Sequence, residues 1–125
     1  MFPMKFLIKI MKSYTNLEQS KKLAEILPPE SADMFLVLNG TQPVMSKYID
    51  DGFVTADNTA IPCWSLAALI ELMGECRMER TPLDQSGAFT HSFVDDYYNI
   101  RTFEEDNAVD AAVEMIYKLK EKDLL

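Results

Sequence analysis

The stretch that most constrains the fold is WSLAALIELMG, residues 64–74, because it carries the start, the buried face and the end of one helix. Ser65 is a preferred N-cap, and Trp64 and Leu69 occupy the two positions of a hydrophobic staple around it. The apolar residues recur at helical spacing: Leu66, Leu69, Ile70 and Met73. Gly74 stands where a left-handed residue commonly ends a helix. The pattern predicts a short, docked helix.

Cys63 lies two residues before this cap, and a helix N-terminus can lower the pKa of a thiol. A nucleophilic cysteine also needs a base, and the only histidine in the chain, His91, must come from another element. We expect Cys63 to be a small buried residue instead. His91 has no second histidine and no Cys-x-x-Cys pair to complete a metal site. Cys63 and His91 remain the two reactive side chains to check, and we predict no catalytic residue, cofactor or metal.

Two further helices are expected. In TNLEQSKKLAEIL, residues 15–27, Thr15 and Glu18 have the spacing of a capping box, and Pro28 with Pro29 should end the helix. In NAVDAAVEMIYKLKEK, Asn107 is an N-cap, followed by a core face at helical spacing. That face consists of Val109, Ala112, Val113, Ile116 and Tyr117.

Between the helices lie strand and turn signals. Asn39-Gly40 favours a hairpin turn after an incoming strand, and Pro43 should place the return strand at a sheet edge. Residues 55–62 look like a loop, and 76–79 like a short strand. AFTHSFV alternates, and YYNIRTF can return as its partner across a turn at Asp95-Asp96. The expected fold is α+β: one domain spanning 1–125, with an antiparallel sheet of about five strands packed with three helices.

The net charge of −8 argues against direct binding of nucleic acid, which requires a basic footprint, and against an anionic membrane surface. No apolar run reaches the roughly 20 residues that span a bilayer. Lysines interrupt the apolar N-terminal stretch, so we expect no signal peptide and a cytoplasmic protein. Two free thiols fit that compartment, although a single disulfide stays open. Met4 and Met11 are alternative starts, so residues 1–10 are expected to be peripheral.

Acidic groups occur at Asp50-Asp51, Asp95-Asp96 and Glu104-Glu105-Asp106, all at predicted turns or before a helix cap. Solvation and the helix dipole explain them without a metal or paired-carboxylate chemistry. Four residues are candidates for contacts with a partner. Glu71 and Glu75 lie one turn apart, opposite the apolar stripe of their helix. Tyr97 and Tyr98 are adjacent on a predicted strand, so at least one should be exposed, and tyrosine is enriched at interfaces.

Three segments together carry a resemblance: LEQSKKLAEILPPESADM (17–34), IPCWSLAALIELM (61–73) and NAVDAAVEMIYKL (107–119). The chain resembles a group of small uncharacterised proteins of Bacteroides-type gut bacteria and of their phages and mobile elements. The resemblance implies a bacterial or phage cytoplasmic setting and an accessory gene. It implies no catalytic residue, cofactor or substrate.

Three functions are compatible with these patterns. The first is a non-catalytic protein-interaction module of phage or mobile-element origin, with an unknown protein partner or a second copy of itself. The second is an acidic decoy or anti-defence protein that mimics nucleic acid or sequesters a ligand. A mimic of nucleic acid would display carboxylates at phosphate spacing on one face. The third is an enzyme of an unrecognised class using His91, Cys63 or the acidic pairs, which would have to converge in one pocket.

Overall fold

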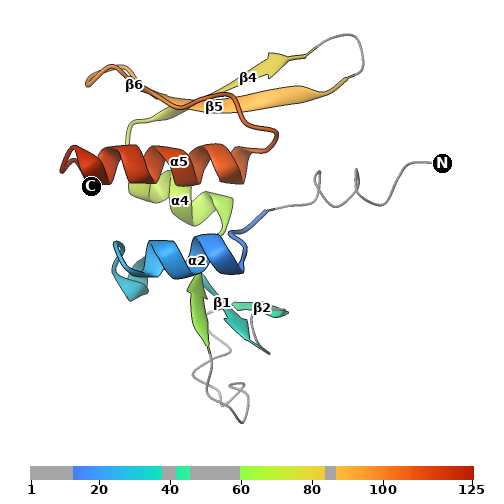
Figure 1. Ribbon diagram of the computed structural model, residues 1–125, viewed down its shortest axis with the longest axis vertical. Helices are drawn as coiled ribbons and strands as arrows, with labels where there is room; N and C mark the ends of the chain where they lie inside the picture. The colour runs from blue at the N-terminus through green and yellow to red at the C-terminus, as the bar shows by residue number, and fades with distance from the viewer. Residues whose placement is uncertain (1–12, 38–41, 46–59, 84–86) are drawn as a thin grey trace. The chain divides into compact units, whose positions relative to one another are not determined.

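A computed structural model describes residues 13–37, 42–45, 60–83 and 87–125 (Figure 1). Within these residues the chain forms three α-helices, one 3-10 helix and six strands, and every strand pair is antiparallel. The α+β class is confirmed. The strands form two three-stranded sheets rather than one sheet of about five. The expectations for residues 1–10, Asn39-Gly40 and Asp50-Asp51 fall outside the described residues.

The described chain divides into two compact units, Tyr14–Ala68 and Leu69–Leu125. The elements of the Tyr14–Ala68 unit are α2 (Leu17–Ala24), the 3-10 helix η1 (Pro29–Ser31), β1 (Met34–Val37), β2 (Gln42–Met45) and β3 (Ile61–Cys63). The strand order is β2-β1-β3, so Pro43 lies in an edge strand as predicted. The predicted loop over 55–62 is wrong at its end, because Ile61 and Pro62 belong to β3. Pro62 is tolerated there because β3 is the other edge of the sheet.

The start of α2 differs from the prediction by one residue. Asn16, not Thr15, is the N-cap: its side-chain oxygen accepts from the amide of Gln19 at 2.8 Å, and the Gln19 side chain accepts from the Asn16 amide at 3.1 Å. The helix ends at Ala24, with Glu25 as its C-cap, before the two prolines are reached. The hydroxyl of Thr15 is buried elsewhere, as described below.

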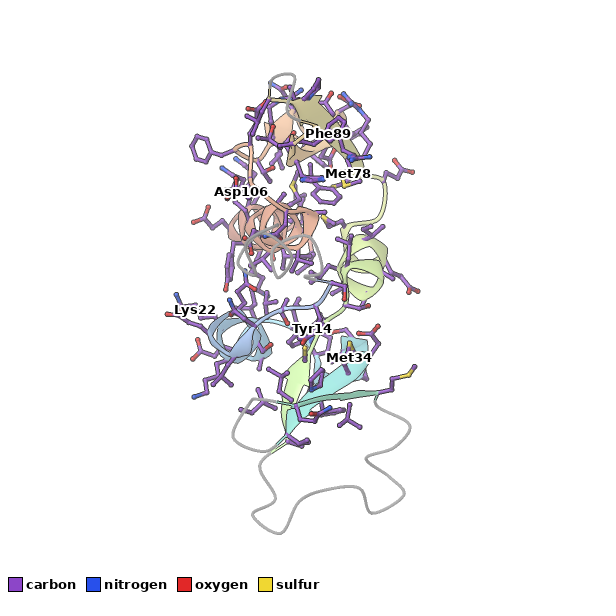
Figure 2. The ribbon with its side chains drawn as sticks, turned by 90° about the vertical axis from the view of Figure 1, so that its right-hand side faces the viewer. Tyr14, Lys22, Met34, Met78, Phe89 and Asp106 are labelled. Atoms are coloured by element: carbon purple, nitrogen blue, oxygen red, sulfur yellow. The ribbon has the colours of Figure 1, made fainter. Side chains whose placement is uncertain are left out.

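The Leu69–Leu125 unit contains the last part of α4 (Leu66–Met73), then β4 (Arg77–Pro82), β5 (Phe89–Asp95), β6 (Ile100–Arg101) and α5 (Ala108–Glu121). The strand order is β4-β5-β6, and α5 packs against β5 (Figure 1). Figure 2 shows the side chains of this sheet, with Met78 and Phe89 labelled. Phe93 and Ile100 are buried in the core of the unit, as is most of the predicted face of α5.

Two helix starts and one helix end are confirmed. The Ser65 hydroxyl accepts from the amide of Ala68 at 3.2 Å, as an N-cap should, and the Asn107 side chain accepts from the amide of Asp110 at 2.9 Å. Gly74 has a φ of 65°, the left-handed conformation that the sequence predicted for it.

The second hairpin is also confirmed, with a shorter return strand than expected. Only Ile100 and Arg101 of YYNIRTF pair with β5. Tyr97 and Tyr98 were expected on this strand, but they lie in the turn that precedes it. The expected strand at 76–79 extends instead from Arg77 to Pro82.

Candidate functional site

A hollow of about 330 Å³ opens on the surface of the Leu69–Leu125 unit. Three apolar, two acidic and two aromatic side chains line it: Met73, Leu119, Leu124, Glu75, Asp95, Tyr97 and Tyr98. We call it the tyrosine hollow. Its volume is at the lower end of the range of ligand sites, about 300–1,000 Å³, so it suits one side chain better than a large ligand.

The two tyrosines are held in place by the turn that carries them. One oxygen of the Asp95 carboxylate accepts from the amides of Tyr97, at 3.0 Å, and Tyr98, at 3.1 Å. The rings meet edge to face, with centroids 4.7 Å apart, yet 83% of Tyr97 and 52% of Tyr98 is exposed to solvent. Asn99 closes the turn in the left-handed conformation, with a φ of 57°. The result is a pair of exposed aromatic rings on a hydrogen-bonded turn.

The apolar residues that line the hollow lie at the C-terminal ends of two helices. Met73 is the last residue of α4, and Gly74 then redirects the chain so that Glu75 also lines the hollow. At the end of α5 the amide of Leu124 donates to the carbonyl of Leu119 at 2.9 Å, across Asp123 with its φ of 58°. This is a Schellman motif, which typically brings its two outer residues together, here Leu119 and Leu124.

The second acidic residue of the turn is neutralised by an ion pair. Asp96 binds Arg77 through two hydrogen bonds, of 2.8 and 3.2 Å, and Arg77 also contacts Glu79 at 2.7 Å. Arg101 pairs with the other oxygen of Glu79. These exposed pairs lower the pKa values of Asp96 and Glu79, mainly through the hydrogen bonds from Arg77. On this face the acidic side chains alternate with arginines and do not form a row of free carboxylates.

Asp95 and Glu75 are different. Within the described ranges, no lysine or arginine lies at ion-pair distance from either carboxylate. The second oxygen of Asp95 has only a long contact, 3.9 Å, to the thiol of Cys76. Burial, and then the neighbouring Asp95 charge, raises the pKa of the Cys76 thiol to about 11, so that thiol stays protonated at neutral pH. Among the described residues, the hollow therefore presents two carboxylates that no lysine or arginine pairs with.

Cys63 is placed in a buried polar network of the other unit. Its thiol donates to the Thr15 carbonyl at 3.3 Å and contacts the Thr15 hydroxyl at 3.6 Å. That hydroxyl also lies 2.8 Å from the Ser20 hydroxyl and accepts from the amide of Trp64 at 3.1 Å. Burial raises the pKa of Cys63. A protonated, fully buried thiol ties the start of α2 to β3 and is poorly suited to attack a substrate.

Trp64 also has a structural role of its own. Its side chain is fully buried, and the indole N–H donates to the Ser31 hydroxyl at 3.0 Å. This bond anchors the 3-10 helix η1 to the residue that precedes the Ser65 cap. The staple contact with Leu69 stays a prediction.

His91 lies in β5 beside an acidic segment. Its backbone exchanges hydrogen bonds with that of Glu105, at 2.7 and 2.8 Å, so the two residues face each other across a β-bridge. Burial, and then hydrogen bonding to Glu114, raises the pKa of Glu105. The buried Nδ1 of His91 has no hydrogen-bond partner in the described part of the chain. Among the described residues no group of three histidine, cysteine or acidic side chains is placed to hold a metal ion.

The structure thus brings three of the four predicted contact residues to one place. Tyr97, Tyr98 and Glu75 line the tyrosine hollow, whereas Glu71 does not. Cys63 and His91 belong to different units. The sequence reasoning missed four lining residues: Met73, Asp95, Leu119 and Leu124. Gly74 in the sequence predicts that the chain changes direction after Met73. Asp123 occupies the equivalent position before Leu124, but an aspartate there does not predict such a change.

No protein-family model, curated protein or solved structure matches this chain. Among the described residues there is no helix with both the length and the apolarity to cross a membrane. The function is therefore inferred from the side chains of the tyrosine hollow and their surroundings.

Proposed function

We propose that the protein is a non-catalytic protein-interaction module, acting in the cytoplasm of a Bacteroides-type bacterium or of its phages and mobile elements, and that the tyrosine hollow is its contact surface. The observation that carries the proposal is the exposure of two adjacent tyrosines, whose backbone amides are held by Asp95, in a hollow that is also lined by apolar side chains. Tyrosine supplies a large contact area with only two side-chain torsions to immobilise, and tyrosines are frequent hot spots of interfaces.

Two features support a binding role over catalysis. The thiols of Cys63 and Cys76 both have raised pKa values, so neither is activated as a nucleophile. The described residues that line the hollow include carboxylates and phenols but no histidine, cysteine or lysine to complete a nucleophile–base pair. The decoy hypothesis has less support than the interaction hypothesis, because a decoy would display unpaired carboxylates. Two of the acidic side chains, Glu79 and Asp96, instead form ion pairs with arginines.

The test is quantitative affinity capture from a lysate of a Bacteroides-type bacterium, combined with light scattering for self-association. The double variant Tyr97→Ser/Tyr98→Ser should lose a protein, or a second copy, that the unchanged chain retains. Phe103→Ser is the matched control, because Phe103 is an aromatic residue of the same unit, 74% exposed, that does not line the hollow. Equal retention by the double variant and the unchanged chain would refute the proposal.

A further inference from the structure

We infer that the tyrosine hollow receives one positively charged side chain, an arginine or lysine, from a basic segment of the partner. This inference rests on the proposed function and adds the chemistry of the contact. Its first support is the lining: Glu75 and Asp95 provide negative charge, and the two rings provide the electron-rich faces that attract ammonium and guanidinium groups.

The helix ends around the hollow favour the same ligand. Met73 ends α4, and Leu119 with Leu124 belongs to the C-terminal cap of α5, so two helix C-termini lie beside the hollow. The C-terminal end of a helix carries partial negative charge, which stabilises nearby cations. The lysines in the last turn of α5 do not line the hollow, and none of its described lining residues is a lysine or an arginine.

Each part of the hollow could recognise a different part of the side chain. The aliphatic stem of an arginine or lysine can pack on Met73, Leu119 and Leu124, which a small inorganic cation cannot do. The charged head can then reach Glu75 or the oxygen of Asp95 that is otherwise contacted by the Cys76 thiol at 3.9 Å. Arginine suits this arrangement better than lysine, because its planar group stacks on rings and forks toward carboxylates. The net charge of −8 would also attract a basic segment over long range.

The experiment is a titration of ¹⁵N-labelled full-length protein, followed by amide chemical shifts. The probes are acetyl-Ala-Arg-Ala-amide and the same peptide with citrulline, which has the shape of arginine without its charge. The arginine peptide should produce saturable shifts at the amides of Tyr97 and Tyr98, and the citrulline peptide should bind roughly fivefold more weakly or worse. Added salt should weaken the arginine peptide only.

Glu75→Gln should weaken the arginine peptide several-fold, whereas Glu71→Gln, the same chemical change one turn earlier and outside the hollow, should not. Both side chains are exposed, so neither change threatens the fold. Equal binding of the two peptides, equal loss in the two variants, or no saturable shift at the tyrosine amides would each overturn the inference. If a partner nevertheless depends on Tyr97 and Tyr98 in the capture experiment, the proposed function stands and only its cationic chemistry fails.

Discussion

Replacing Thr15 with valine should lower the unfolding free energy of the Tyr14–Ala68 unit by about 2–4 kcal/mol. Valine keeps the shape of threonine but removes the buried hydroxyl. The amide of Trp64 then loses its acceptor at 3.1 Å, and a buried donor left unsatisfied costs about 1–3 kcal/mol. The Ser20 hydroxyl loses a partner at 2.8 Å and keeps only the Thr15 carbonyl at 3.4 Å, which adds about 1 kcal/mol.

The assay is urea unfolding followed by the fluorescence of Trp64, the only tryptophan, which is buried in the same unit. Thr15→Ser is the control, because it keeps the hydroxyl and removes one methyl group, at a cost of about 1 kcal/mol. If the valine variant is as stable as the serine variant, the buried network does not hold α2 to β3 and the reasoning fails.

Three further predictions concern the other unit and the thiols. At pH 8 a thiol-exchange reagent should modify Cys76 roughly 100-fold more slowly than an ordinary thiol, because the pKa of Cys76 is about 11 instead of 9.0. Cys63, whose pKa is raised by burial, should react only when the protein unfolds. Rapid modification of either thiol in the native protein would contradict this prediction. Asp123→Gly should raise the free energy of unfolding by about 0.5–1 kcal/mol, because glycine adopts the left-handed conformation of this helix cap more easily than aspartate. Thermal unfolding followed by circular dichroism measures the change. A lower free energy of unfolding would mean that the Asp123 side chain stabilises the cap. Burial, and then hydrogen bonding to Glu114, raises the pKa of Glu105 in the folded protein above its ordinary 4.5. The stabilising contribution of protonated Glu105 is therefore present below pH 4.5 and is lost as the pH rises through the folded-state pKa. Glu105→Gln should therefore be more stable than the unchanged chain at pH 7 but not at pH 4 in urea titrations, and an equal difference at both pH values would refute the assignment.

Helix caps were the most predictable features of this fold. Ser65 and Asn107 were found from sequence because each is a strong capping residue directly before its apolar stripe. At α2 two capping residues are adjacent, and local spacing could not choose between Thr15 and Asn16. The choice is made by tertiary structure: Thr15 is needed in the buried network with Cys63, and Asn16 is left to cap.

The strands were less predictable, for two physical reasons. β3 is three residues long and contains Pro62, so it shows neither alternation nor the composition of a strand. The return strand after β5 is cut to Ile100 and Arg101 because Asp95 caps the turn with its side chain and draws both tyrosines into it.

The tyrosines and Glu75 of the candidate site could be picked out as contact residues, but the hollow could not. Its apolar lining combines the ends of two helices, and Met73 and Leu119 are 46 positions apart in the sequence. No local sequence pattern predicts that two such distant segments meet. Asp123 adopts the left-handed conformation just before Leu124, which lines the hollow. Sequence rules that expect glycine at this helix-cap position do not predict it.

The most direct test of the account is photo-crosslinking from inside the tyrosine hollow. The chain would carry p-benzoylphenylalanine in place of Tyr98 or, as the control, in place of the exposed Phe103 of the same unit. The account predicts a discrete crosslinked product, to one partner or to a second copy, from position 98 and not from position 103. Products of the same identity and yield from both positions, or none from position 98, would contradict the claim that this hollow is the contact surface.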